Sequence, residues 1–124
     1  MQRILIVEDD ETLAAALAEY FRSQDHEVEW AQEVEEAKAL VTYRDYAVAV
    51  VDLGLASFGG MDGLELIAFI HERKPQTCVV ALTGYREDAI RQEALNRGAV
   101  AFFSKPVPLA VVARAAAPWL EVAI

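Results

Sequence analysis

Acidic, hydroxyl and amino side chains directly follow the apolar runs of this sequence, and together they could carry out metal-assisted phosphoryl chemistry. They are Glu8 and Asp9 after residues 3–7, Asp52 at the end of 47–52, Thr83 after 78–82 and Lys105 after 100–104. Carboxylates that share one crevice repel each other at neutral pH unless some are protonated or a cation binds. Their hard oxygen ligands suit Mg²⁺, which takes one or two carboxylates and keeps several waters. A carboxylate beside such a metal, an ammonium group and a hydroxyl is equipped to attack phosphorus and to hold the resulting acyl phosphate.

The apolar runs themselves predict strands. Residues 3–7, 47–52 and 78–82 are almost continuously apolar, which is typical of strands buried on both faces. Residues 27–31 (EVEWA) alternate between polar and apolar, as a less buried edge strand would, and residues 100–104 (VAFFS) are the fifth candidate.

The stretches between and after these runs predict helices, because their apolar residues recur at helical spacing. The apolar positions are Leu13, Leu17 and Phe21; Val34, Ala37, Leu40 and Val41; Leu64, Ile67 and Ile70 or His71; Ala89, Ile90, Ala94 and Leu95; and most of residues 108–117. Gly98 is a helix-stop signal before the fifth strand.

Five strand–helix pairs in strict alternation predict one α/β domain with a doubly wound, five-stranded parallel sheet. Pairs this short favour the flavodoxin-like strand order 2-1-3-4-5 over a barrel or a larger dinucleotide-binding fold. That order makes the second strand an edge, in agreement with its alternating pattern. Ligands of such sheets bind at the carboxyl ends of the strands, where all five polar residues above are expected to lie.

Composition narrows the functional classes. A chain of 124 residues suits a single domain over 1–124, and its formal net charge of −9 argues against direct binding to nucleic acid or an anionic membrane. Cys78, the only cysteine, lies in an apolar run, so we expect a core residue and no disulfide framework. The N-terminal apolar run is too short for a signal peptide, and no run could span a bilayer. We therefore expect a cytoplasmic protein.

Three other uses of strand-end residues are disfavoured by the sequence. The acidic segment after the first strand would repel a flavin phosphate, and it contains no G-x-G-x-x-G dinucleotide fingerprint. A haloacid-dehalogenase-type phosphatase carries its nucleophilic aspartate on the first strand, with a second acid two residues later. Here Asp52 lies on the third expected strand, and Gly54 occupies the second position.

Five motifs in order, ILIVEDD, VVDLGL, MDGLEL, ALTG and GAVAFFSKP, resemble those of CheY-like receiver domains of two-component response regulators over essentially the whole chain. The resemblance implies that Asp52 accepts a phosphoryl group from a sensor histidine kinase or phosphotransfer protein, with Mg²⁺ bound. It implies that Asp9 and Asp52 are metal ligands, that Glu8 acts through water, and that the Gly54 backbone carbonyl is a further ligand.

The resemblance also assigns roles at the last two strands. Thr83 would hydrogen-bond the phosphoryl group, Lys105 would pair with it, and Phe102 would be an aromatic switch that turns inward when Thr83 moves. The Lys105–Pro106 bond would be cis. The protein would be a signalling switch and binding module, and no enzyme beyond weak self-catalysed phosphotransfer and autodephosphorylation.

Several residues are better explained by structure than by chemistry. Asp10 is expected to cap the first helix, and Asp62 with Glu65 to begin the third. His26 and His71 show no ligand pattern. Pro118 is expected to end or kink the last helix, so that 118–124 form a tail or a linker stub.

The segment after Asp52 departs from the family pattern. Ala56 replaces the usual proline, and Asp62 lies 62 − 52 = 10 residues past Asp52, roughly three more than the usual spacing. We hypothesise that the lengthened loop, Ala56–Met61, alters water access or partner docking; alternatively, a surface loop simply tolerates the insertion. Deleting Ser57–Gly59 without changing phosphoryl lifetime or partner affinity would exclude the functional version.

Two alternative functions remain open at the level of the sequence. One is a pseudo-receiver, an interaction module that is not regulated by phosphorylation, which the unusual loop after Asp52 keeps possible. The other is a small Mg²⁺-dependent phosphatase, although no dedicated general acid is evident. The last helix is apolar around most of its circumference, so its outer face, with Phe102 and the fourth helix, is a candidate dimer or partner surface. The cognate kinase and the output domain or protein are not indicated.

Overall fold

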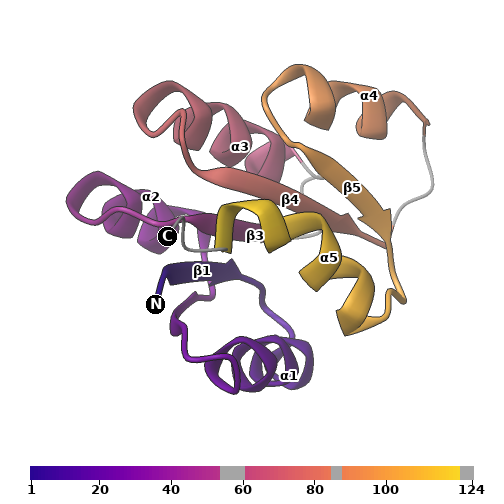
Figure 1. Cartoon of the computed structure of the whole chain (residues 1–124). Coiled ribbons are helices and arrows are strands. Elements are labelled where there is room, and N and C mark those ends of the chain that lie inside the picture. Colours follow the sequence, from indigo (N-terminus) through magenta and orange to yellow (C-terminus); the bar gives the residue numbers. More distant parts are fainter. Residues whose placement is uncertain (54–60, 85–87, 121–124) are drawn as a thin grey trace.

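The computed structural model describes residues 1–53, 61–84 and 88–120, in which strands and helices alternate as predicted (Figure 1). The elements are β1 (Arg3–Val7), α1 (Glu11–Arg22), β2 (Glu27–Ala31), α2 (Val34–Tyr43), β3 (Val48–Asp52), α3 (Met61–Arg73), β4 (Cys78–Thr83), α4 (Asp88–Asn96), β5 (Ala101–Ser104) and α5 (Leu109–Leu120). None of the helices described is long and apolar enough to cross a membrane. The lengthened loop Ala56–Met61, apart from the start of α3, and the side chain of Asp62 lie outside the described residues.

The strands form one parallel sheet in the order β2-β1-β3-β4-β5, which confirms the predicted order and makes β2 an edge. The register places Val7 opposite Val51 on β1 and β3, and Asp52 opposite Leu82 on β3 and β4. The chain therefore leaves β1, β3 and β4 at the same level, so the residues that follow β1 emerge beside Asp52.

Both faces of the sheet are covered, by α2, α3 and α4 on one side and by α1 and α5 on the other (Figure 1). On β1, Leu5 and Val7 belong to the first core cluster, whereas Ile4 and Ile6 belong to the second. Successive strand residues point to opposite faces, so a strand covered on both sides must be apolar at nearly every position. This requirement explains the continuous apolar runs of the sequence.

Local signals at the helix ends behave as expected. The Asp10 carboxylate caps α1 by accepting hydrogen bonds from the backbone N–H groups of Thr12 and Leu13 at 2.9 and 3.3 Å. Gly98 follows α4 with φ = +121°, a conformation that L side chains rarely adopt. Cys78 is buried in the core, and of the two alternatives on α3, Ile70 is buried while His71 is exposed.

Of the two outcomes expected at Pro118, a helix end is wrong, because α5 continues through this residue to Leu120. A kink at Pro118 stays a prediction. A proline inside a helix removes one backbone hydrogen bond. Here Leu120 is buried in the same cluster as Val112 and Ala116, and this packing favours the continued helix. Any tail therefore begins after Leu120, and residues 121–124 lie outside the described residues.

Candidate functional site

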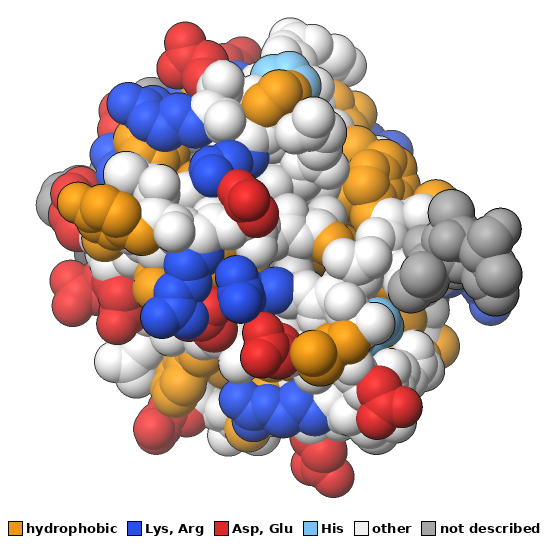
Figure 2. Space-filling view, turned by 60° about the vertical axis from the view of Figure 1, so that its left-hand side comes forward, with side chains coloured by type: hydrophobic (Ala, Val, Ile, Leu, Met, Phe, Trp, Pro, Cys, Tyr) orange, Lys and Arg blue, Asp and Glu red, His pale blue; other side chains and the backbone are white. Residues whose placement is uncertain are grey.

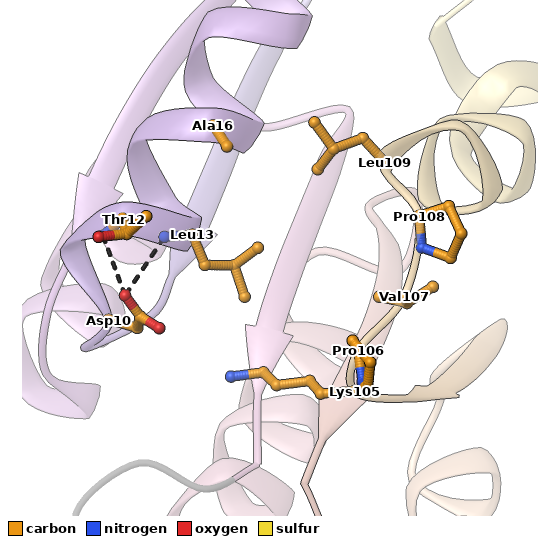
Figure 3. Close-up of a pocket in the computed structure, with 9 residues that line it drawn as sticks. All are labelled: Asp10, Thr12, Leu13, Ala16, Lys105, Pro106, Val107, Pro108 and Leu109. Carbon is orange, nitrogen blue, oxygen red and sulfur yellow. Dashed lines mark hydrogen bonds between the residues drawn. The ribbon is translucent and has the colours of Figure 1, made fainter.

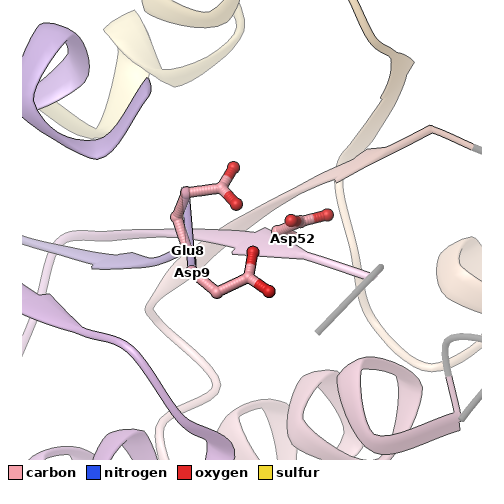
Figure 4. A group of neighbouring side chains, drawn as sticks. All are labelled: Glu8, Asp9 and Asp52. Carbon is pink, nitrogen blue, oxygen red and sulfur yellow. The ribbon is translucent and has the colours of Figure 1, made fainter. Parts of the chain in front are cut away.

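Three carboxylates meet where β1 and β3 end (Figure 4). Glu8 and Asp9 follow β1 directly, Asp52 is the last residue of β3, and one oxygen of each lies within 4.8 Å of the others. Glu8 and Asp52 are 1% and 4% exposed, whereas Asp9 is exposed. The predicted convergence of these residues is therefore observed. Two of the carboxylates are buried at the carboxyl ends of the strands, and one lies at the surface.

Lys105 brings a cation to the two buried carboxylates. Its Nζ donates hydrogen bonds to Oε1 of Glu8 and Oδ2 of Asp52, both at 2.9 Å. Its backbone N–H donates to the carbonyl of Thr83 at 2.7 Å, which ties the end of β5 to the end of β4. The Lys105–Pro106 peptide bond is cis, as expected.

Burial shapes the electrostatics of this cluster. Desolvation, and then the neighbouring Asp52 carboxylate, raise the pKa of Glu8 to about 8 despite the opposing effect of Lys105. Burial alone would lower the pKa of Lys105, but its hydrogen bonds to Glu8 and Asp52 outweigh this effect and raise it. At neutral pH the Glu8 carboxyl therefore tends to hold a proton until another positive charge arrives.

The donor set fits a hard divalent cation. Carboxylate oxygens are the preferred ligands of such ions, and the exposure of Asp9 leaves one side of the cluster open to waters or a phosphate oxygen. A cation would also relieve the repulsion between the carboxylates, which one lysine only partly offsets. The Gly54 carbonyl, the remaining expected ligand, lies outside the described residues.

Thr83 and Phe102 are placed by the neighbouring strands. Thr83 is the last residue of β4, fully buried, one position beyond the Leu82 that pairs with Asp52. Phe102 lies on β5 opposite Ala81, and its side chain is buried in the core cluster on the α2–α3–α4 side. In this structure the ring therefore belongs to the core and not to an outer face of α4, β5 and α5.

A contact to the acidic pair that the sequence did not suggest comes from the edge strand. The Trp30 indole Nε1–H on β2 donates to the backbone carbonyl of Glu8 at 2.7 Å. The pattern of residues 27–31 indicated an edge strand but no role in the site. The one available signal was the predicted pairing of β1 with β2, which brings an N–H-bearing aromatic ring near the end of β1.

A groove that the sequence does not indicate opens beside Lys105, between the start of α1 and the segment leading into α5 (Figure 3). Its volume is about 680 Å³, and it is lined by Asp10, Thr12, Leu13, Ala16, Lys105, Pro106, Val107, Pro108 and Leu109. A second hollow of about 330 Å³ continues along α1 and shares Ala16 and Leu109 with the first. The walls are mainly apolar, and Lys105 lines the groove while its amino group contacts the carboxylates.

Comparisons with known proteins agree with this geometry. Residues 4–117 match the family of the response regulator receiver domain. The photosynthetic apparatus regulatory protein RegA of Cereibacter sphaeroides is 39% identical over 103 residues, which are 83% of this chain and 54% of RegA. The acid tolerance regulatory protein ActR of Rhizobium meliloti is 34% identical, over 83% of this chain and 52% of ActR. The chain thus spans about half the length of these relatives.

Solved structures show the same likeness. A CheY-like receiver domain protein from Methanospirillum hungatei superposes with a TM-score of 0.84 at 29% identity, over 92% of this chain and 89% of that one. A response regulator from Burkholderia pseudomallei, solved with a phosphorylated aspartic acid, a calcium ion and citrate, has a TM-score of 0.84 at 28% identity, over 93% of this chain and 66% of that one. Because residues 4–117 match this family and the fold is that of solved receiver domains, the chain belongs to the response regulator receiver domains.

Proposed function

We propose that this receiver is a phosphorylation-dependent switch of a two-component system, which accepts a phosphoryl group on Asp52 in the presence of Mg²⁺. The observation that carries the proposal is the cluster at the carboxyl ends of the strands, where Asp52 lies among Glu8, Asp9 and the Lys105 ammonium group. An aspartate in such surroundings is both a nucleophile and a ligand of the cation that neutralises the incoming phosphoryl group.

In the proposed reaction, an Asp52 carboxylate oxygen attacks phosphorus. The new O–P bond forms as the bond between phosphorus and the donor's leaving atom breaks, and the leaving group takes that electron pair. Asp9 and Asp52 would hold Mg²⁺, with Glu8 acting through water and the Gly54 carbonyl as the ligand that the family resemblance adds. The ion would supply positive charge next to the phosphoryl oxygens.

Lys105 and Thr83 are the residues proposed to hold the product. Lys105 contacts Asp52 already, so a phosphoryl group attached there would come within reach of its ammonium group. The Thr83 hydroxyl would donate to a phosphoryl oxygen from the end of β4. The Burkholderia pseudomallei structure supports this chemistry, since that similar protein contains a phosphorylated aspartic acid and a calcium ion.

The proposed output is a population shift that Thr83 and Phe102 pass to the face formed by α4, β5 and α5. A homodimer through that face is part of the proposal. Val100, which is 45% exposed just before β5, and Ala110, which is exposed on α5, supply apolar surface. Light scattering measures the molar mass of the protein in solution. A molar mass equal to that of the monomer at every protein concentration, with and without phosphorylation, would exclude the dimer.

The donor is proposed to be a sensor histidine kinase or a phosphotransfer protein, and the output region or protein is not specified by this chain. Self-catalysis is proposed to be limited to phosphotransfer to Asp52 and its later hydrolysis. Both proposals rest on the membership of this chain in the receiver family.

Incubation with acetyl phosphate and Mg²⁺, followed by intact mass spectrometry, tests the proposal. Wild-type protein is expected to gain one phosphoryl group, and the gain should disappear in Asp52→Asn and in wild type treated with EDTA. No Mg²⁺-dependent gain in the wild type would reject phosphorylation and favour the pseudo-receiver.

A further inference from the structure

Trp30 reaches the cation site from the edge of the sheet. The bond from its indole N–H to the Glu8 carbonyl measures 2.7 Å, at the short end of the range for N–H···O contacts. Its ring is partly buried against the core cluster that contains Ile6, the residue opposite it on β1. Packing of the ring therefore holds the N–H group in place, and the ring and its donor are two separable features of this residue.

The bond falls on the peptide that joins the two acidic residues. Other parts of Glu8 are held elsewhere: its backbone N–H donates to the Ala31 carbonyl at 3.1 Å, and its carboxylate accepts from Lys105 and, at 3.3 Å, from the backbone N–H of Asp10. Trp30 alone among the described residues contacts its carbonyl by a hydrogen bond from a side chain. Since a peptide unit is planar, fixing that carbonyl also fixes the direction in which the chain enters Asp9.

Asp9 depends on this backbone more than its neighbours do. Its side chain is exposed, and within the described part of the chain it makes no hydrogen bond or ion pair. Glu8 and Asp52, by contrast, are each tied to Lys105. The direction in which the backbone enters Asp9 therefore limits the positions that its carboxylate can reach in the cluster.

We propose that Trp30 is a positioning residue for the cation site, which orients the Glu8–Asp9 peptide so that Asp9 joins Glu8 and Asp52 around the ion. The proposal rests on the proposed function in that it assumes a divalent cation binds there. Trp30 itself touches neither the cation nor the phosphoryl group. A single net hydrogen bond sets the size of the effect, so its loss should weaken cation binding about twofold to tenfold.

Trp30→Phe keeps most of the ring and removes the donor, and Trp119→Phe is the matched control on α5. Binding of Mn²⁺ alone is measured by the loss of the free-ion signal in electron paramagnetic resonance, and Mg²⁺ by competition. We expect Trp30→Phe to bind both ions about twofold to tenfold more weakly at every pH, and Trp119→Phe to match the wild type. Urea unfolding of the metal-free proteins measures any separate loss of stability.

Equal cation affinity in Trp30→Phe and wild type, with or without a loss of stability, would overturn the positioning role. A wild type that binds no cation would overturn this role and the proposed function together. The wild type could also bind cations but gain no phosphoryl group. If Trp30→Phe then bound cations more weakly than the wild type, the positioning role would be supported and only the proposed function would be rejected.

A second measurement needs no variant. In the wild type, the Trp30 indole N–H resonance should move on titration with Mg²⁺, and the Trp119 indole resonance should stay in place. Of these two tryptophans, Trp30 is the one whose indole N–H bonds to the Glu8 carbonyl. If neither resonance, or both equally, responded to saturating Mg²⁺, the role would be overturned.

Discussion

Glu8 is buried and lies in a cluster of carboxylates, and these two features together raise the pKa of its carboxyl group. Glu8 is 1% exposed and its carboxyl group lies beside Asp52, and both conditions penalise the ionised form. In the metal-free protein its pKa is raised to about 8, above its value in an unfolded chain. Folding therefore favours the protonated carboxyl, and this contribution to stability is lost as pH rises from about 4.5 through about 8.

A bound cation reverses that preference, which makes its affinity depend on pH. The cation favours ionised Glu8, so binding below pH 8 should release up to one proton, and affinity should rise with pH before levelling off above about 8. The rise is at most tenfold per pH unit for one proton. Mg²⁺ titrations from pH 6 to 9 in buffers of different ionisation enthalpy measure both the affinity and the proton release.

Glu8→Gln provides the control for this dependence. Its amide cannot titrate, so the slope between about pH 6 and 8 should flatten while the site remains intact. The same slope in the variant and the wild type would show that another group releases the proton. Trp30→Phe should differ from both, with a lower affinity and an unchanged slope, because Glu8 still titrates in that variant.

At the scale of elements, α1 and the segment before α5 frame the groove beside Lys105. We expect a protein phosphodonor to dock there, because the groove gives a mainly apolar surface next to Lys105, which contacts Asp52. Ala16→Arg should fill the groove and slow phosphotransfer from the donor protein roughly tenfold. Ala15→Arg, at the exposed neighbouring position outside both hollows, should not.

Phosphorylation by acetyl phosphate separates docking from chemistry. It needs no docking surface, so Ala16→Arg should accept a phosphoryl group from the small donor as quickly as the wild type. A slow reaction with both kinds of donor would place the defect in the site itself. Equal rates of protein phosphotransfer for the two arginine variants would exclude the groove as a docking surface.

The turn from α4 into β5 leads to a second prediction at the scale of elements, which concerns the stability of a variant at Gly98. Gly98 has φ = +121°, and a Cβ added there would lie 2.5 Å from Cγ of His71 on α3. Gly98→Ala should therefore destabilise the protein by about 1–3 kcal/mol through backbone strain and this clash. Adding His71→Ala should recover the part of the clash made by the imidazole ring, and leave the strain and the close contact with Cβ of residue 71 at 2.8 Å. Urea unfolding of the single and double variants measures each part, and an unchanged free energy of unfolding in Gly98→Ala would contradict the argument.

Some features of this architecture follow from the local sequence pattern and could be predicted, whereas others depend on contacts between distant residues and could not. Burial on both faces makes a central strand apolar throughout, so β1, β3 and β4 and the residues at their ends could be placed from the sequence alone. The extent of α5 could not, because the local penalty of Pro118 competes with the tertiary burial of Leu120. The Trp30–Glu8 bond joins residues 22 apart and depends on the reach of one side chain across two strands.

At the scale of the whole molecule, the two ends of the sheet differ in how their charges are balanced. Figure 2 brings forward the side on which the N-terminus lies, where basic and acidic side chains are interspersed. Ion pairs near the starts of the strands include Arg3 with Glu27 and Arg44 with Glu29. Such exposed pairs contribute little to stability. At the carboxyl ends, by contrast, Glu8 and Asp52 share Lys105, and Asp9 adds a third carboxylate that pairs with no described residue, so the unbalanced charge is concentrated at the proposed phosphoryl site.

This imbalance links the stability of the whole fold to the cation. An ion that binds only the folded state stabilises it by mass action, so above its dissociation constant each tenfold increase in Mg²⁺ should add about 1.4 kcal/mol to the free energy of unfolding. Salt also screens the repulsion expected from a net charge of −9, so NaCl at matched ionic strength is the necessary reference.

Urea unfolding at pH 8.5, where Glu8 should be ionised, compares the effects of Mg²⁺ and NaCl on wild type and on Asp9→Asn. Asp9 is exposed, so its amide should leave the metal-free fold intact and remove most of the difference between Mg²⁺ and NaCl. Equal stabilisation by both salts in the wild type would mean that Mg²⁺ acts only by screening, and that the carboxylates at the sheet edge do not form a specific cation site.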